Sequence, residues 1–260
     1  MQHRTPVKAV LFDFDGTIST LRFGWENVMK PLMLEMISGG SSWNDALEKE
    51  VSDYINESTG IQTIHQMRWL AETVHARGMN PTASTDPWWY KNEYNRRLME
   101  NVNARLTALN SGTTPRNEFL IGGSDAFLQA LRARSVRMFV ASGTDQADVI
   151  KEASALGVAS YFEQISGALP GSEACSKEKV LAQLMENLGL NGDEFAVIGD
   201  GKVEIRLGRE AGARTVGLAS DEAARYGVNP VKEARLVAAG ADMICGDFTD
   251  MNALLHFLGL

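Results

Sequence analysis

Two carboxylates stand two residues apart where an apolar run near the amino end of the chain stops. The run covers residues 9–12, and Asp13, Asp15, Gly16 and Thr17 follow it. One carboxylate at such a position can attack phosphorus as a nucleophile, and the second can donate a proton to the leaving oxygen. Because Gly16 permits a tight turn, Asp15 can lie one step out over the reacting group. The pattern predicts nucleophilic and acid–base chemistry at the end of a buried strand.

Two further positions are suited to holding a phosphoryl group. The apolar run at 138–141 is followed by Ser142 and Gly143, whose hydroxyl and backbone N–H groups can bind a phosphoryl oxygen. Lys177, at the start of a later helical pattern, can neutralise the charge that builds as phosphate transfers. Lys179 is the alternative candidate for this role, and the spacing to Gly199, 22 residues after Lys177, favours Lys177. These residues predict a phosphate site beside the two carboxylates.

More carboxylates follow a third apolar run. Residues 195–198 lead into Gly199 and Asp200, and Glu204 stands about one helical turn after Asp200. Together with Asp13, they offer the hard oxygen ligands that Mg²⁺ prefers in proteins. Ligands of open parallel sheets bind beyond the carboxyl ends of the strands, so we expect these loops to meet at one edge.

The elements that position these residues follow from the spacing of apolar side chains. Continuous short apolar runs are typical of strands that are covered on both faces, and they lie at residues 9–12, 138–141, 195–198, 215–218 and 243–245. Helical patterns separate them, at residues 124–134, 147–156, 178–188, before Gly212 and after Thr249. Ser124 and Thr249 are the expected N-caps of the first and last of these helices. The alternation predicts an α/β fold with a doubly wound parallel sheet, Rossmann-like in architecture.

A helical block interrupts this alternation after the first strand. Residues 21–117 contain all five tryptophans, and Asp86-Pro87 is a typical start of a long helix. We therefore expect an inserted all-helical domain at 21–117 and an α/β core domain formed by residues 1–20 and 118–260. Its aromatic cluster consists of Trp88, Trp89, Tyr90 and Tyr94. We interpret the cluster as core of the insert, with lining of a substrate pocket by some of its members as the alternative. Arg22 and Trp25, at the start of the block, are candidate substrate contacts.

Composition limits the partners. The chain has 260 residues and a formal net charge of −8, which gives no support to a surface for nucleic acid or anionic membranes. Cys175 and Cys245 make no disulfide framework, no signal-peptide pattern precedes the first strand, and no apolar stretch approaches a membrane span. We expect a cytoplasmic monomer or homodimer that binds neither nucleic acid nor membrane.

In their order and spacing, Asp13-x-Asp15-Gly16-Thr17, the Ser142 loop, Lys177, and Asp200 with Glu204 resemble the four motifs of the haloacid dehalogenase superfamily. The resemblance covers essentially the whole chain and is to members of the phosphoglycolate phosphatase and β-phosphoglucomutase type, whose helical cap is inserted at this point. It implies that Asp13 is the nucleophile and that Asp15 is the general acid/base, with its backbone carbonyl on the metal. Asp200 and Glu204 would complete the metal site, and the implied phosphate contacts are Thr17, Ser142, Gly143 and Lys177. Glu204 departs from the commoner Asp, and the longer side chain could bind through water or orient the neighbours of Asp200.

The resemblance implies a Mg²⁺-dependent phosphatase that acts on a small phosphorylated metabolite, either a phosphosugar or a phosphoglycolate-like compound. A phosphosugar mutase of the β-phosphoglucomutase type is the alternative within catalysis. A non-catalytic protein that binds or senses a phosphorylated ligand is the alternative outside catalysis. A dehalogenase is disfavoured, because displacing halide from carbon needs neither Asp15 nor the metal ligands.

Overall fold

The structure of the protein is a computed structural model, which describes residues 5–171 and 177–260. The chain divides into two compact units. The α/β unit comprises Met1–Phe23 and Leu106–Leu260, and the helical unit comprises Gly24–Arg105, which is shorter at both ends than the expected insert of 21–117. In the described part of the chain, no helix combines the length and apolar character needed to cross a membrane.

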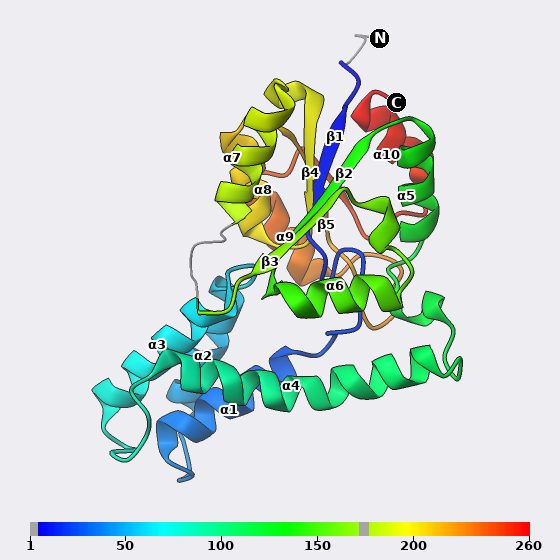
Figure 1. The fold of residues 1–260 in the computed structure, drawn as a ribbon. Helices are drawn as coiled ribbons and strands as arrows, with labels where there is room; N and C mark the ends of the chain where they lie inside the picture. The colour runs from blue at the N-terminus through cyan, green and yellow to red at the C-terminus, as the bar shows by residue number, and fades with distance from the viewer. Residues whose placement is uncertain (1–4, 172–176) are drawn as a thin grey trace. The chain divides into compact units, whose positions relative to one another are not determined.

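A six-stranded parallel sheet forms the centre of the α/β unit (Figure 1). Its order is β3-β2-β1-β4-β5-β6. The strands are β1 (Ala9–Phe12), β2 (Arg137–Asp145), β3 (Gln164–Ala168), β4 (Phe195–Gly199), β5 (Arg214–Leu218) and β6 (Met243–Cys245). In register, Phe12 of β1 pairs with Val140 of β2 and with Ile198 of β4. The residues that follow these three positions therefore emerge at the same edge of the sheet, and the predicted doubly wound α/β fold is confirmed.

Helices cover both faces of this sheet. They are α5 (Ser124–Ala133), α6 (Gln146–Ala155), α7 (Lys177–Leu188), α8 (Lys202–Glu210), α9 (Pro230–Ala239) and α10 (Met251–Leu258). Figure 1 shows α7 and α8 on one side of the sheet and α5 and α10 on the other. Leu11 of β1 packs in one buried cluster with Leu181 of α7, whereas the ring of Phe12 meets that of Phe127 of α5 edge-on at 6.5 Å. Neighbouring residues of β1 thus serve opposite cores, as alternation along a strand requires.

Two elements of the α/β unit were not predicted. The sequence of β3, Gln-Ile-Ser-Gly-Ala, lacks a continuous apolar run, and β3 is an edge strand with a single neighbour, a position that does not require one. Helix α9 follows β5, and it begins with Asn229 as N-cap and Pro230 in its first turn. This Asn-Pro pair is a start signal that the sequence offered.

Other expectations need correction in detail. Strand β2 does not end at Ala141 but continues to Asp145, so Ser142 and Gly143 belong to a strand and not to a loop. Its pairing with β3 shifts register between Ala141 and Asp145, and a β-bulge of this kind frees side chains to re-aim at a strand end. Ser142 and Gly143, the expected phosphate contacts, therefore lie in a bulged strand end.

The predicted caps of two helices also differ. The N-cap of α5 is Gly123, and Ser124 is the first helical residue, with a buried hydroxyl that has no hydrogen-bond partner among the described residues. Helix α10 is capped by Asp250, whose Oδ1 accepts from the N–H of Ala253 at 3.1 Å. Thr249 instead donates its hydroxyl to Asp247, because the carboxylate of Asp250 reaches the free N–H groups of the first turn.

The helical unit is built on aliphatic residues. Its helices are α1 (Glu26–Ser38), α2 (Asp45–Glu57), α3 (Thr63–Arg77) and α4 (Pro87–Asn110), whose last residues belong to the α/β unit. Its core is largely Met, Leu, Ile and Val, together with buried Tyr90 and Tyr94. All five tryptophans are described and none is fully buried, and Trp89 is 45% exposed. The expected aromatic core is thus right for the tyrosines and wrong for Trp89.

Of the two cysteines in the sequence, the structure describes Cys245. Cys175 is outside the described residues, whereas Cys245 on β6 is a free, half-buried thiol. Burial, with help from Asp247 and Asp250, raises the pKa of Cys245 to about 12. This thiol therefore stays protonated at neutral pH and is unsuited to nucleophilic chemistry.

Candidate active site

Asp13 is held directly after the carboxyl end of β1, a central strand of the sheet. Its backbone N–H donates to the carbonyl of Ile198 at 2.9 Å and so extends the pairing of β1 with β4 by one residue. Its Oδ1 accepts from the N–H of Phe14 at 2.8 Å, which sets the rotation of the carboxyl group. Asp13 is only 7% exposed. The nucleophile expected from the sequence is therefore held rigidly before any ligand binds.

Three carboxylates converge on this point. Oxygen atoms of Asp13, Asp200 and Glu204 lie within 4.8 Å of one another, and all three residues are buried. Lys177, the first residue of α7, places its Nζ 2.9 Å from Oδ2 of Asp13 and 3.2 Å from Oε2 of Glu204. Lys179 is exposed, so the structure brings Lys177 and not its rival to the cluster. The group of oxygens could hold a metal ion.

The charges in this cluster are strongly perturbed. Burial raises the pKa of Asp13 well above its ordinary value, Lys177 opposes this rise, and the neighbouring carboxylates reinforce it. Burial alone would lower the pKa of Lys177, but the carboxylates of Asp13 and Glu204 outweigh it and raise that pKa. Lys177 is therefore always charged and balances part of the negative charge that the fold collects here.

Glu204 uses both of its oxygens within the protein. Its Oε1 accepts from the N–H of Gly201 at 2.9 Å and closes the first turn of α8, while Oε2 accepts from Lys177. Although burial opposes it, the pull of Lys177 lowers the pKa of Glu204. Glu204 is thus an ionised carboxylate that also orients the loop carrying Asp200.

Asp15 lies opposite the bulged end of β2. Its Oδ2 accepts from the hydroxyl of Thr144 at 2.8 Å and from that of Ser142 at 3.4 Å. The N–H of Thr144 donates to the Ser142 hydroxyl at 3.1 Å, so the bulge ties both side chains together. Thr144 was not among the predicted site residues, although it follows Ser142 and Gly143 directly. The bulge thus positions the predicted acid/base through two hydroxyls.

Arg22 is buried at the end of the first segment of the α/β unit, and the substrate contact expected of it stays a prediction. Its guanidinium donates to Oε1 of Glu152 at 2.7 and 3.0 Å and to Asp148 at 3.3 Å, and both acceptors lie on α6. Its Nε lies 3.9 Å from Oδ1 of Asp15. The pair Arg22–Glu152 was not predicted, because the two residues are 130 positions apart. Arg22 therefore borders the acid/base, and its main partner is a carboxylate that is fully buried.

The buried Glu152 makes stability depend on pH. Burial raises the pKa of Glu152 to about 7, although Arg22 opposes the shift. Since this pKa exceeds that of the unfolded chain, the contribution of Glu152 is full below about pH 4.5 and is lost as the pH rises through 7. Between pH 5 and 8, the unfolding free energy of Glu152→Gln should therefore rise relative to wild type, by at most about 3 kcal/mol. Urea unfolding at several pH values measures this difference.

A matched control is Glu163→Gln. Glu163 is half-exposed and paired with Arg137 at 2.6 Å, and this pairing lowers the pKa of Glu163, so it stays ionised from pH 5 to 8. Its difference from wild type should not change over that range. A constant difference for Glu152→Gln as well would show that Glu152 is already ionised at pH 5.

The remaining predicted residues occupy varied positions. Thr17 is fully buried, and its hydroxyl has no hydrogen-bond partner among the described residues. Gly143 lies half-buried in the bulge of β2. Trp25 lies half-buried in the helical unit, directly before α1. The substrate contacts expected of these three residues stay predictions.

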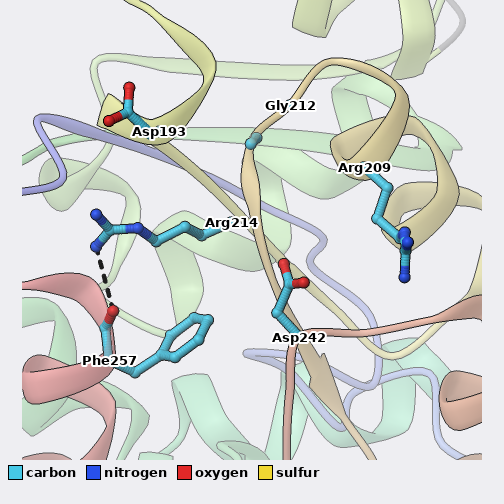
Figure 2. A pocket seen from close by; sticks show the side chains of 7 residues that line it. Asp193, Arg209, Gly212, Arg214, Asp242 and Phe257 are labelled. Carbon is cyan, nitrogen blue, oxygen red and sulfur yellow. Dashed lines mark hydrogen bonds between the residues drawn. The ribbon is translucent and has the colours of Figure 1, made fainter. Parts of the chain in front are cut away.

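A hollow of about 560 Å³ lies near the amino ends of β4, β5 and β6, away from the strand ends that carry the acidic cluster (Figure 2). Its lining includes Asp193, Arg214 and Asp242, which precede or begin strands, together with residues of α8 and α10. Arg214 donates to the carbonyl of Phe257 at 3.2 Å, the bond drawn in Figure 2, and Asp242 accepts from the hydroxyl of Thr215 at 2.9 Å. None of the predicted site residues lines this hollow, so we do not associate it with the acidic cluster.

A family model of the haloacid dehalogenase-like hydrolases matches residues 7–212. The chain therefore belongs to the haloacid dehalogenase-like hydrolases, and the resemblance seen in its motifs is confirmed. The matched region contains every residue of the acidic cluster and Lys177. A comparison with curated protein sequences gives no significant match.

Solved structures share the fold. A "predicted phosphatase" from Clostridium acetobutylicum superposes with a TM-score of 0.62 at 17% identity, over 97% of this chain and 98% of the other. A "predicted phosphoglycolate phosphatase" from Haemophilus somnus 129pt gives 0.63 at 17% identity, over 96% and 98%. A β-phosphoglucomutase from Clostridium difficile gives 0.61 at 14% identity, over 97% of both chains. At these identities, the likeness establishes the architecture.

Proposed function

We propose that the protein is a Mg²⁺-dependent phosphatase of a small phosphorylated metabolite, a phosphosugar or phosphoglycolate-like compound, with an aspartyl-phosphate intermediate on Asp13. The observation that carries this proposal is the contact of Asp13 with Lys177 at 2.9 Å inside a cluster of three buried carboxylates. A protein that merely binds an anion has no use for carboxylates facing it. The similar structures are described as phosphatases and a phosphoglucomutase, which agrees with phosphoryl chemistry.

The donor set fits a hard divalent cation. Asp13, Asp200 and Glu204 offer only oxygen ligands, and their atoms lie close enough together to share one ion. The backbone carbonyl of Asp15 would join them, as the family resemblance implies. When bound, Mg²⁺ would neutralise negative charge on the phosphoryl oxygens.

The residues divide the reaction into two steps. In the first, a carboxylate oxygen of Asp13 attacks phosphorus, the bond from phosphorus to the ester oxygen breaks, and protonated Asp15 gives its proton to the leaving alcohol. In the second, Asp15 takes a proton from water, the water oxygen attacks phosphorus, and the bond to Asp13 breaks to release inorganic phosphate. Lys177 would neutralise the charge that develops in both steps. Ser142 and Thr144 would keep Asp15 aimed at the ester oxygen.

The helical unit would act as a cap that selects the substrate. It is inserted between β1 and the rest of the α/β unit, at the point where the family carries its helical caps. Trp25 is the second residue of this unit and is the residue we would first examine for an effect on substrate choice. Closure of such a cap excludes water while the leaving group departs.

A screen of phosphorylated metabolites tests the proposal. We expect release of inorganic phosphate from at least one phosphosugar or phosphoglycolate-like compound in Mg²⁺, loss of release in EDTA, and recovery when Mg²⁺ is restored. An isomerised phosphosugar without released phosphate would instead identify a mutase. No turnover across the panel, together with tight binding of a phosphorylated compound, would identify a binding protein.

A further inference from the structure

A second lysine, Lys232 on α9, contacts the acidic cluster at Asp200, whereas Lys177 contacts it at Asp13 and Glu204. Its ammonium donates to Oδ2 of Asp200 at 2.6 Å, to Oε1 of Glu222 at 2.7 Å and to the hydroxyl of Ser220 at 3.1 Å. The Ser220 hydroxyl in turn donates to the carbonyl of Gly16 at 2.5 Å. The three donors of an ammonium are thus matched by three acceptors, so the nitrogen has one defined position.

This lysine stands where a cation is unfavourable for the helix itself. Lys232 is in the first turn of α9, capped by Asn229, and the amino end of a helix carries positive charge. Only 12% of its side chain is exposed, so burial adds a further cost. The carboxylates of Asp200 and Glu222 outweigh that cost and raise the pKa of Lys232. A charged lysine is therefore held there by its acidic partners and not by the helix.

Helix α9 contacts Asp200 through two side chains. Lys232 binds the side-chain carboxylate, and Arg235, one turn further on, donates to the backbone carbonyl of Asp200 at 3.4 Å. Gly16 packs against the same carboxylate, so closely that a Cβ at that position would stand 2.9 Å from Cγ of Asp200 and 3.1 Å from Nζ of Lys232. The rotation of the Asp200 carboxylate is thus set by groups outside the metal-ligand set.

We propose that Lys232 is a positioning residue for the cation site: it holds the Asp200 carboxylate in a fixed rotation, so that one oxygen is taken by the ammonium and the other is left for the divalent cation. This inference rests on the proposed function in so far as it takes Asp200 to be a metal ligand. Glu222 balances the charge of Lys232, so the pair adds orientation to the site without adding net charge.

The double variant Lys232→Met/Glu222→Gln separates orientation from charge. It removes one positive and one negative charge together, so the net charge around Asp200 is unchanged. We expect its affinity for Mn²⁺, measured by calorimetric titration without substrate, to fall at least tenfold. Lys232→Arg keeps the charge but not the three-donor geometry, so its affinity for Mn²⁺ should fall at least threefold. Because the charge is kept, this variant should fold even if the double variant does not. A high Mg²⁺ concentration should restore most of the turnover of both variants, which a general structural defect would not allow.

The matched control is Lys8→Met, which removes an exposed lysine paired with Glu194 at the opposite edge of the sheet and should leave Mn²⁺ affinity unchanged. Wild-type affinity in the double variant, or in Lys232→Arg, would overturn the inference. A wild-type chain that binds no Mn²⁺ would overturn it together with the cation site. Cation binding that depends on Lys232 in a protein without phosphatase activity would uphold it and overturn only the proposed function.

Discussion

Replacing Asp13 by Asn should lower turnover by at least about a thousandfold, the scale on which removal of a nucleophile acts. The amide has no carboxylate oxygen to attack phosphorus, so the covalent intermediate cannot form. Mass spectrometry of protein quenched in acid during turnover should find phosphate on the wild-type chain and none on the variant.

The fold should survive this substitution. Burial and the neighbouring carboxylates already raise the pKa of Asp13, so the site tolerates a neutral group of the same shape. Lys177 keeps Glu204 as a partner at 3.2 Å. We expect a melting temperature equal to or above that of wild type. Asp193→Asn, an exposed change at the opposite edge of the sheet, is the control and should leave turnover unchanged. Normal hydrolysis by Asp13→Asn would remove Asp13 from the nucleophile's role.

A methyl group at position 16 should damage both stability and activity. Gly16 has φ +71°, a conformation that costs other residues about 1–2 kcal/mol. The new Cβ would also overlap the Asp200 carboxylate and lie 3.1 Å from Nζ of Lys232. Gly16→Ala should therefore lose more stability than the backbone cost alone, and its turnover should fall at least about a hundredfold, since displaced catalytic groups cost this much.

Gly227→Ala is a close control for this variant. Gly227 has φ +83°, but a Cβ there would meet no atom within 4 Å. It should lose only the backbone cost and keep its turnover. Urea unfolding and phosphate release measured on both variants separate the two contributions. Equal losses in the two variants would mean that the contact with Asp200 is not the cause.

The sequence predicted what depends on local order. Strands buried on both faces must be apolar throughout, so β1 and β4 were visible as runs, and their parallel register brings Asp13 and Asp200 to one edge. β3 was missed because an edge strand with one neighbour does not need such a run. The bulge at Ser142 was missed because it depends on a register shift against β3, which no pattern within β2 records.

Contacts between distant segments were the least predictable. Arg22 was expected to contact a substrate, and its pairing with Glu152, 130 positions away on α6, was not predicted. Lys232 reaches Asp200 across 32 positions, and its helix was not predicted. A charged side chain in a sequence carries no mark of its partner, so such pairs emerge only when the topology is known. Their burial makes them consequential all the same, because a buried charge without its partner is costly.

The match to the family model ends at residue 212 of this chain, and Lys232 and Arg235 lie beyond the matched residues. Every residue that defines membership can therefore stay the same while the helix that steadies Asp200 changes. If Lys232 orients Asp200 as proposed, relatives with identical signature residues can differ in the divalent-cation concentration that they need, because α9 lies outside the matched residues. Exchanging α9 between relatives would then change the cation concentration needed for activity while the residues proposed to react stay the same.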